Sequence, residues 1–488
     1  MKLVEIARFC GGKCSGNFGK TLVNGIATDS RGKVAGKVFV ALTGENFDGH
    51  NYVQAAIDKG AKAAIVSDAE GFSRGQYGKR AILVDDTLKA LADIAEGYLQ
   101  NYLPEMRRIA VTGSVGKTTT KELVHAVLAS RFKAEKTPLS HNNEVGLPMT
   151  ALSLNPDTEI FVAEMGMRGF GQIQYLERIV RPEAAVITTI GNAHLELLGS
   201  RENILKAKME VTIGGSRLPK NKPFRLIVNG DNDLLGDTPK LREIAAGYGC
   251  DNIETITFGM GPASTFRATE AICGEDGVNY LLICPQGNLR VSLPIPGEHN
   301  IYNSLAAIAA GSIFGISPSE AVSAIVNYAA ESGGDKSIRQ RTVKLAGGKL
   351  TLIDDAYNAG PESMPASLKV LHGIKADAHI AALADMVELG PKSPEFHREV
   401  GRIAAKYCDK LFTVGEKARD YAVAFDGAVN KAGSAASFAK DEIDAVFAAV
   451  KAYIDPLLSA RKSAAILVKG SHIMEMGRLS KLIEGAYK

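Results

Sequence analysis

The sequence predicts an α/β protein that is built from three domains. The chain has 488 residues, which is too long for one hydrophobic core and favours two to four domains. Short β-rich runs alternate with segments of helical spacing, a pattern typical of parallel sheets that are covered by helices. A glycine-rich loop also lies between a strand-like run and a helix-like run, the context that a phosphate-binding loop requires.

The first hundred residues are expected to form a small N-terminal α/β domain. From residue 37 onward, the runs KVFVAL, AAIVSD and AILVDD have the composition of strands, and TLKALADIAEGYLQNYL has helical spacing. A turn-like NYLPEM follows these runs. We therefore place the first domain at residues 1–100.

The second domain is expected over residues 101–330. RRIAVTG leads directly into the glycine loop, and the buried-looking strands EIFVAEMG, AAVITTIG, FRLIVNGDN and ETITFG recur with helical segments between them. This pattern predicts a doubly wound parallel sheet, which binds ligands at the carboxyl ends of its strands. No repeat of 20 to 50 residues is found, which excludes solenoids and propellers.

The third domain is expected over residues 331–488. The Gly- and Ser-rich ESGGDKSIRQR interrupts a helical region, and a second series of strands follows: LTLIDDAYN, HIAALADM, KLFTVG and SAAILVKGS. We expect a Rossmann-like fold for this part of the chain.

The composition excludes several classes of protein. The formal net charge of +3, from 57 basic and 54 acidic residues, gives no reason to expect a nucleic acid or an anionic membrane as partner. No apolar run is long enough to span a bilayer, and the first twenty residues carry no signal-peptide core. Six cysteines are too few for a disulfide framework, and CGGKC lacks a second cluster at zinc spacing. We expect a soluble cytoplasmic protein with reduced thiols.

The segment TGSVGKTTT predicts a nucleotide site with a shortened loop. In the usual G-x-x-x-x-G-K-[ST] pattern the first glycine would stand at position 111, which is Val111. Lys117 can reach the β- and γ-phosphates, and the hydroxyl of Thr118 can ligate Mg2+. An ordinary strand-to-helix turn is the alternative, but the preceding strand RRIAV disfavours it. The residues expected to contact the nucleotide are Gly113, Ser114, Val115, Gly116, Lys117, Thr118 and Thr119.

Two further polar residues stand at or after the ends of predicted strands. Glu164 ends EIFVAEMG, so its carboxylate should emerge at the same sheet edge as the loop, where it could hold Mg2+. His194 follows AAVITTIG, although a lone histidine is more often a hydrogen-bonded or surface residue. Neither residue establishes a metal site by itself.

These motifs together resemble a known family. TGSVGKTTTK, AEMG, TTIGNAHLELLGS and KAKMEV occur in the order seen in Mur ligases, the ATP-dependent amide-forming enzymes of peptidoglycan synthesis. TDSRGKVAGKVFVALTGENFDGHNYV, HNNEVGLPMTAL, LIDDAYNAGPESM and ILVKGS are similar to the branch that joins D-alanyl-D-alanine to UDP-N-acetylmuramoyl-tripeptide. The resemblance extends from about residue 28 to about residue 475. It implies that ATP activates a peptide carboxylate as an acyl phosphate, which the dipeptide amine then attacks.

The resemblance also implies two magnesium sites. Thr118 and Glu164 match the ligands of the first ion, and His194 matches a ligand of the second. Lys208 matches the lysine that the family carbamylates, a modification that turns a cation into an anionic oxygen ligand. Lys206 is the nearby alternative, and an unmodified solvent-facing lysine is the ordinary interpretation. Lys117, His194 and Lys208 are thus the expected catalytic residues.

Other matches concern the nucleotide. Asn303 in GEHNIYNSLAA is the best match for an adenine contact, with Asn300 as second choice, although either could instead cap the helix that begins there. Asp355 matches the ribose contact, but could be a turn residue after a strand. The phosphate-binding arginine is assigned to Arg339, and Arg341 stays open as its alternative.

The substrate contacts are implied in the same way. Ser30 and Arg31 would face the uridine diphosphate, and Asn142 and Asn143 would face the peptide. An Asx-type turn and an ordinary loop are the respective alternatives. His472 stands where many relatives have an arginine, which weakens any role of that loop in substrate recognition.

Two other functions remain open at this point. One is a different amide ligase of the superfamily, either a folylpolyglutamate synthase or the Mur enzyme that adds the third residue, whose usual Asp-Asn-Pro-Arg motif is absent. The other is a nucleotide-binding scaffold without ligation activity. We expect a monomer, and the third residue of the acceptor peptide, diaminopimelate or lysine, stays open.

Overall fold

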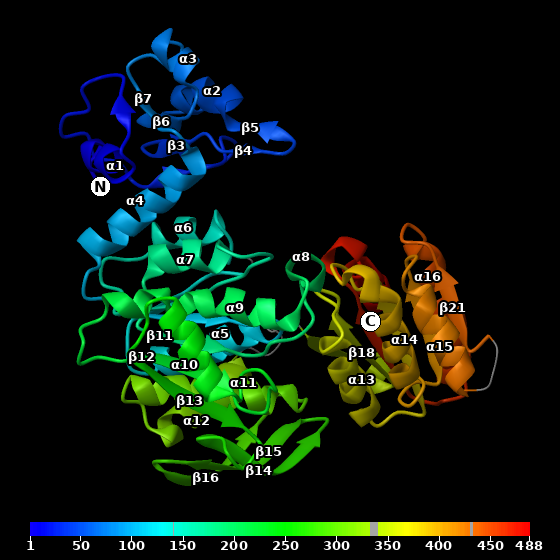
Figure 1. The fold of residues 1–488 in the computed structure, drawn as a ribbon. Coiled ribbons are helices and arrows are strands. Elements are labelled where there is room, and N and C mark those ends of the chain that lie inside the picture. Colours follow the sequence, from blue (N-terminus) through cyan, green and yellow to red (C-terminus); the bar gives the residue numbers. More distant parts are fainter. Residues whose placement is uncertain (140, 332–339, 430–432) are drawn as a thin grey trace. The chain divides into compact units, whose positions relative to one another are not determined.

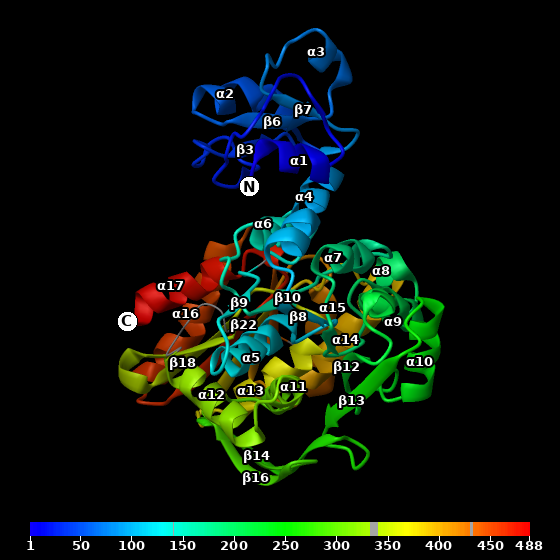
Figure 2. The ribbon, with the colours of Figure 1, turned by 90° about the vertical axis from the view of Figure 1, so that its left-hand side faces the viewer.

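The computed structural model describes residues 1–139, 141–331, 340–429 and 433–488 (Figures 1 and 2). These residues form two compact units. The first unit comprises Met1–Ala110, Lys133–Met167 and Gly171–Glu183, and the second comprises Val111–Phe132, Arg168–Phe170 and Ala184–Lys488.

The N-terminal part of the first unit is a five-stranded sheet in the order β1-β7-β6-β3-β2, in which only β1 is antiparallel to its neighbour. The strands β3 and β6 are buried along their whole length, which explains their continuous apolar runs. The elements are α1 (Leu3–Phe9), β1 (Lys13–Cys14), β2 (Ile26–Ala27), β3 (Val38–Val40), β4 (Thr43–Gly44), β5 (Phe47–Asp48), η1 (Gly49–Tyr52), α2 (Val53–Asp58), β6 (Ala63–Val66), α3 (Ala69–Ser73), β7 (Ala81–Leu83) and α4 (Thr87–Tyr102).

The helix α4 joins this sheet to the remainder of the first unit. Asp86 caps the helix by accepting hydrogen bonds from the backbone N–H groups of Leu88 and Lys89. At the other end, the buried Arg108 donates further hydrogen bonds to the carbonyl oxygens of Leu99 and Leu103, each of which also accepts a backbone N–H. Residue 100, the predicted end of the first domain, lies within α4. This helix contacts α1 in the N-terminal part and α6 and α7 in the rest of the unit.

The remainder of the first unit contains the first strands of the central sheet. There β8 (Arg107–Thr112) begins beside β10 (Ile160–Glu164), which pairs in parallel with β9 (Ala134–Lys136). The helices are α6 (Gly146–Ala151) and α7 (Gln172–Val180). The hydroxyl of Tyr175 on α7 donates to the carbonyl oxygen of Leu88 on α4 at 2.9 Å, so these strands and the N-terminal sheet form one body.

The central part of the second unit holds the end of β8 and the strands β11 to β16. Thr188, just after β11, donates its backbone N–H to Thr112 at the end of β8, and β11 to β14 are parallel. The strands are β11 (Ala184–Ile187), β12 (Phe224–Asn229), β13 (Ile253–Gly259), β14 (Phe266–Gly274), β15 (Gly277–Cys284) and β16 (Gly287–Leu293). The helices are α5 (Lys117–Ala129), α8 (Leu195–Leu198), α9 (Arg201–Met209), η2 (Glu210–Arg217), α10 (Thr238–Gly247), α11 (His299–Ile313) and α12 (Pro318–Glu331).

The antiparallel strands β14, β15 and β16 were not among the predicted elements. Buried and exposed residues alternate along β15 and β16, so one face of this extension is solvated. The predicted doubly wound parallel sheet is therefore confirmed for its first strands and continues as an antiparallel meander.

The C-terminal part of the second unit is a six-stranded sheet in the order β17-β18-β22-β19-β20-β21, parallel except for β17. Its strands are β17 (Arg341–Leu345), β18 (Leu350–Asp355), β19 (Ala378–Ala384), β20 (Lys410–Val414), β21 (Ala435–Phe438) and β22 (Ala464–Lys469). Its helices are η3 (Ala346–Gly348), α13 (Ser363–Gly373), η4 (Gly390–Lys392), α14 (Ser393–Ala404), α15 (Arg419–Val429), α16 (Ile443–Ser459), η5 (His472–Met474) and α17 (Gly477–Tyr487).

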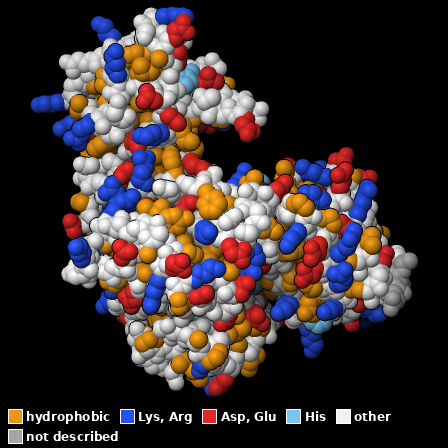
Figure 3. All heavy atoms as spheres, viewed as in Figure 1, with side chains coloured by type: hydrophobic (Ala, Val, Ile, Leu, Met, Phe, Trp, Pro, Cys, Tyr) orange, Lys and Arg blue, Asp and Glu red, His pale blue; other side chains and the backbone are white. Residues whose placement is uncertain are grey.

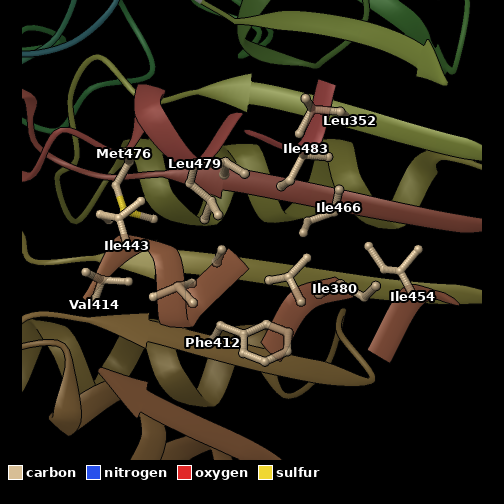
Figure 4. Close-up of a cluster of buried hydrophobic side chains, with 14 of the residues drawn as sticks. Leu352, Ile380, Phe412, Val414, Ile443, Ile454, Ile466, Met476, Leu479 and Ile483 are labelled. Atoms are coloured by element: carbon tan, nitrogen blue, oxygen red, sulfur yellow. The ribbon is translucent and has the colours of Figure 1, made fainter. Parts of the chain in front are cut away.

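Helices cover both faces of this sheet. On one face, Ile443 and Ile454 of α16 and Ile483 of α17 pack against Ile466 and Phe412 of the strands (Figure 4). The other face is covered by α13, α14 and α15. This layered arrangement confirms the predicted Rossmann-like fold.

Acidic and basic side chains are interspersed on the visible face (Figure 3), in line with the small net charge. All six cysteines are unpaired. Within the described ranges, no helix has the length and apolarity that crossing a membrane would require.

Candidate active site

The phosphate loop connects β8 to α5 and needs glycine at two positions. Gly113 and Gly116 have φ angles of 145° and 85°, which residues other than glycine rarely adopt. A Cβ at Gly113 would also collide with Thr188. Gly191 donates its backbone N–H to Ser114 Oγ at 2.9 Å, which ties the loop to the segment after β11. The shortened loop is therefore a defined strand-to-helix connection held by neighbouring backbone.

Lys117 is the first residue of α5 and folds back over this loop. Its Nζ donates to the carbonyl oxygens of Gly113 at 2.7 Å and Ser114 at 3.3 Å. Thr118 follows it and is buried. The ammonium group and the N-terminus of α5 thus lie at the same point, where they favour an anion.

A cavity of about 1120 Å³ in the second unit brings several predicted residues together. Ser114 to Thr119 of the loop line it, as do His194, Asn303 and Asp355. The loop follows β8, His194 follows β11 and Asp355 ends β18, the position where α/β folds bind ligands, whereas Asn303 lies in helix α11. Lys208 is not among the lining residues.

His194 lies after β11 in a left-handed conformation, with φ at 66°. Its Nδ1 is 2.5 Å from Oε2 of Glu388, which itself has φ at 62°. The Nε of Arg168 lies 3.5 Å from the other carboxylate oxygen. The hydrogen bond with His194 lowers the pKa of Glu388, so this carboxylate is ionised at neutral pH.

Lys208 lies in α9 and is 1% exposed, whereas Lys206 on the same helix is exposed. Burial, assisted by the charge of Lys117, lowers the pKa of Lys208 well below its ordinary value. Among the described residues, its Nζ makes no hydrogen bond or ion pair. Lys208, rather than Lys206, is therefore the lysine whose buried environment favours the neutral amine.

Asn300 and Asn303 lie inside α11, so the alternative that they cap this helix is wrong. The residue before the helix is Glu298, because the helix begins at His299, earlier than the alternative assumed. Asn300 Nδ2 donates to the carbonyl oxygen of Pro296, and Asn303 Nδ2 donates to Asn300 Oδ1 at 3.0 Å. Asn303 keeps a second N–H of its amide for a ligand in the cavity.

Asp355 is the last residue of β18 and is not a turn residue. Lys469 ends the adjacent strand β22, and its Nζ lies 2.6 Å from Asp355 Oδ2. Ser367 Oγ donates to the same oxygen at 2.6 Å. Both charged side chains are largely buried, at 3% and 13% exposure for Lys469 and Asp355.

We expect Lys469→Met to destabilise the protein by about 3 kcal/mol, because it leaves the buried carboxylate of Asp355 without its countercharge. Urea unfolding of variant and wild type, followed by circular dichroism, measures this loss. The double variant Lys469→Met, Asp355→Asn should regain much of the stability, since no uncompensated charge remains. Equal stability of the single variant and the wild type would contradict this account.

Only one of the two candidate phosphate-binding arginines lies within the described residues. Arg339 falls outside the described residues. The Arg341 guanidinium contacts the carboxylates of Asp354 and Glu484, which occupy its charge. The contact of Arg339 with phosphate stays a prediction.

Glu164 and Asn142 are brought together in the first unit. Glu164 is buried at the end of β10, and its Oε1 accepts a hydrogen bond from Asn142 Nδ2 at 2.8 Å. Asn143 Oδ1 accepts from the backbone N–H of Gly146, so it holds the loop before α6. The role of Glu164 as a metal ligand stays a prediction.

The TDSR segment forms the Asx-type turn that was considered as its alternative. Asp29 Oδ1 accepts the backbone N–H of Arg31 at 2.9 Å, and the Arg31 guanidinium pairs with the same carboxylate. The Ser30 carbonyl oxygen accepts a hydrogen bond from Lys59. Arg31 is exposed, and contacts of Ser30 and Arg31 with uridine diphosphate stay predictions.

Three family models match successive parts of the chain. The family model for the Mur ligase family, catalytic domain, matches residues 22–99, the Mur ligase middle domain matches 111–311, and the Mur ligase glutamate ligase domain matches 339–472. The UDP-N-acetylmuramoyl-tripeptide--D-alanyl-D-alanine ligase of Bacillus subtilis is 36% identical over 476 residues, which are 96% of this chain and 94% of the relative. This chain belongs to the Mur ligase family.

Solved Mur ligase structures agree with this assignment. A crystal structure of MurF from Acinetobacter baumannii has a TM-score of 0.83 and 30% identity, and the match covers 99% of this chain and 98% of that one. MurF ligase from Thermotoga maritima in complex with ADP has a TM-score of 0.77 and 25% identity, over 96% and 98% of the two chains. The α/β fold with N-terminal, middle and C-terminal Mur ligase domains is thus confirmed, while the boundaries at residues 100 and 330 stay predictions.

Several residues of this Mur ligase site escaped sequence reasoning. Lys469, Glu388 and Arg168 line the cavity, and Glu362 accepts hydrogen bonds from the backbone and side chain of Asn192. Lys469 could have been predicted from its position, because it is a charged residue at the end of the apolar strand AAILVK. His472 also lines the cavity, with its ring 5.7 Å from the ring of Tyr357.

Proposed function

We propose that this Mur ligase joins D-alanyl-D-alanine to UDP-N-acetylmuramoyl-tripeptide in peptidoglycan synthesis, with conversion of ATP to ADP and phosphate. The observation that carries the proposal is a glycine loop with Lys117 at its end, in a cavity that also contains His194 and Asp355. The Bacillus subtilis relative named for this reaction, which matches nearly the whole chain, supports the choice of substrates.

In the proposed reaction the nucleotide lies along the cavity. The loop residues 113–119 bind the phosphates, Asn303 contacts adenine, and Asp355 contacts ribose. The buried positions of the two polar side chains, each held by neighbouring protein groups, support these roles. Arg339 is proposed as a further phosphate contact.

The chemistry follows from charge and position. The terminal carboxylate of the tripeptide attacks the γ-phosphorus of ATP, so that an acyl phosphate forms and ADP leaves, although the two reacting groups repel each other as anions. Lys117 places a cation at this point. The dipeptide amine then attacks the acyl carbon, and phosphate leaves from the tetrahedral intermediate. In reactions of this kind, positioning the reactants in line accounts for most of the catalysis.

Magnesium would neutralise phosphate charge at this site. Thr118 and Glu164 are proposed to hold one ion, and His194 together with carbamylated Lys208 a second. In the parts of the chain that the structure describes, no three His, Cys, Asp or Glu side chains gather closely enough to hold a metal. A carbamate on Lys208 would supply a missing anionic oxygen, and the neutral amine of that residue is the form that reacts with carbon dioxide.

The residues proposed to contact the UDP-tripeptide belong to the first unit. Ser30 and Arg31 are proposed to contact the uridine diphosphate, and Asn142 and Asn143 the peptide. The Arg31 guanidinium pairs with Asp29 but is exposed, so an anion can reach it from solvent. We further propose that the enzyme acts as a monomer in the cytoplasm, where its nucleotide substrates are made.

Purified protein given ATP, Mg2+ and UDP-N-acetylmuramoyl-tripeptide should release phosphate only when D-alanyl-D-alanine is also present. A phosphate assay with each substrate omitted in turn measures this dependence, and tripeptides ending in diaminopimelate or lysine identify the third residue. Faster reaction with a single amino acid than with the dipeptide would favour another amide ligase. Nucleotide binding without any ligation would favour a scaffold.

A further inference from the structure

The hydrogen bond between Glu388 and His194 joins the two halves of the cavity. His194 follows β11 of the central sheet, and Glu388 follows β19 of the C-terminal sheet. Oε2 of the glutamate lies 2.5 Å from Nδ1 of the histidine, and both side chains are partly shielded from water. Among the described residues, Nε2 of His194 has no hydrogen-bond partner.

The backbone holds both residues in place. Each has a positive φ, which residues other than glycine rarely adopt and which persists only where the surroundings impose it. The backbone N–H of Glu196 also donates to the carbonyl oxygen of Glu388 at 3.4 Å. The two loops are therefore connected by a backbone contact as well as by the side chains.

The loop before Glu388 is fixed by buried groups. Asp385 Oδ1 accepts the backbone N–H of Ala418 at 2.7 Å. The backbone N–H of Met386 donates to Nε2 of the buried His397, and the other ring nitrogen of His397 donates to the carbonyl oxygen of Ser393. Such a loop can present the Glu388 carboxylate in one position.

A carboxylate that accepts a hydrogen bond from Nδ1 decides which nitrogen of the ring carries the proton. The proton stays on Nδ1, and the lone pair stays on Nε2, which is the form that binds a metal ion. We propose that Glu388 is a positioning residue that fixes His194 in this tautomer and orientation for the second metal ion. The metal part of this inference rests on the proposed function, whereas the tautomer does not.

The same contact could instead serve only to hold the two halves of the cavity together. Glu362 provides a matched comparison, because it also reaches from the C-terminal part to the segment after β11. Its Oε1 accepts from the backbone N–H and Nδ2 of Asn192, both at 2.7 Å, two residues before His194. Loss of Glu362 removes a contact of the same kind without touching the imidazole.

The first test is a nitrogen-15 NMR spectrum of the metal-free protein labelled at its histidines, with His194 assigned by comparison with His194→Gln. The wild type should show a protonated Nδ1 and an unprotonated Nε2 for His194. In Glu388→Ala this pattern should give way to the mixture of tautomers of a free imidazole, while Glu362→Ala keeps it. A proton on Nε2 in the wild type would overturn the proposal without reference to any variant.

The second test is a titration with Mn2+ in the presence of ADP and bicarbonate, followed by electron paramagnetic resonance. Glu388→Ala should weaken the site that His194→Ala removes by about 10- to 100-fold. Glu388→Asp should recover part of this affinity, and Glu362→Ala should leave it unchanged.

Equal weakening in Glu362→Ala and Glu388→Ala would show that the contact acts only by holding the two halves together. Unchanged Mn2+ affinity in Glu388→Ala would also refute the positioning role. If ligation activity were absent while the tautomer and the Mn2+ results held, the proposed function would fail and the positioning role would stand.

Discussion

Lys117→Ala is expected to abolish ATP-dependent product formation and to leave the fold intact. In the structure the Lys117 ammonium lies over the loop, where its Nζ contacts the carbonyl oxygens of Gly113 and Ser114. When a γ-phosphate is transferred, this cation offsets the charge that develops on the phosphoryl oxygens. Removal of one such group from a preorganised site typically costs about 10²- to 10³-fold in rate.

The measurement is ADP release in a coupled assay, at saturating UDP-tripeptide and D-alanyl-D-alanine. Circular dichroism spectra and melting temperatures of variant and wild type serve as the control for folding. Lys240→Ala, which changes a partly exposed lysine of α10, should keep wild-type turnover. Turnover near the wild-type rate in Lys117→Ala would refute the assignment of the loop.

The features of the fold that the sequence predicted have local causes. Buried parallel strands such as β10 and β22 are continuous apolar runs, and the glycine loop joins a strand to a helix within a few residues. The meander of β14 to β16 was missed because its strands are half-buried and mix polar with apolar residues. The packing of α4 on α7 depends on side chains far apart in the sequence, which no local pattern reveals.

The site residues divide in the same way, into those that a local motif predicts and those that depend on contacts far apart in the sequence. Lys117 and Thr118 follow from one short motif, and Asn303 and Asp355 were found only through the family resemblance. The partners of these residues could not be read from the sequence, because Lys469 lies 114 positions from Asp355 and Glu388 lies 194 positions from His194. The first pair forms because β18 and β22 are neighbours in the C-terminal sheet, and the second because segments that follow strands of two sheets line one cavity.

We expect Lys208→Ala to lose most of the ligase activity, and added acetate or propionate to restore part of it. A protonated lysine would repel a metal ion, but burial favours the neutral amine at this position. The neutral amine can attack carbon dioxide, form an N–C bond and release a proton, which leaves an anionic carbamate. A small carboxylate can occupy the space that the side chain leaves and provide a similar oxygen ligand.

The assay is phosphate release at increasing concentrations of acetate or propionate, with sodium chloride at equal ionic strength as the control. Lys206→Ala is the matched variant, because Lys206 lies two residues away on the same helix but is exposed, and its activity should be unchanged. His194→Ala should weaken the dependence on Mg2+ without comparable rescue, since the lost ligand is a nitrogen rather than a carboxylate-like oxygen. Full activity of Lys208→Ala without added acid would refute the role of the carbamate, and loss of activity in Lys206→Ala instead would move that role to the exposed lysine.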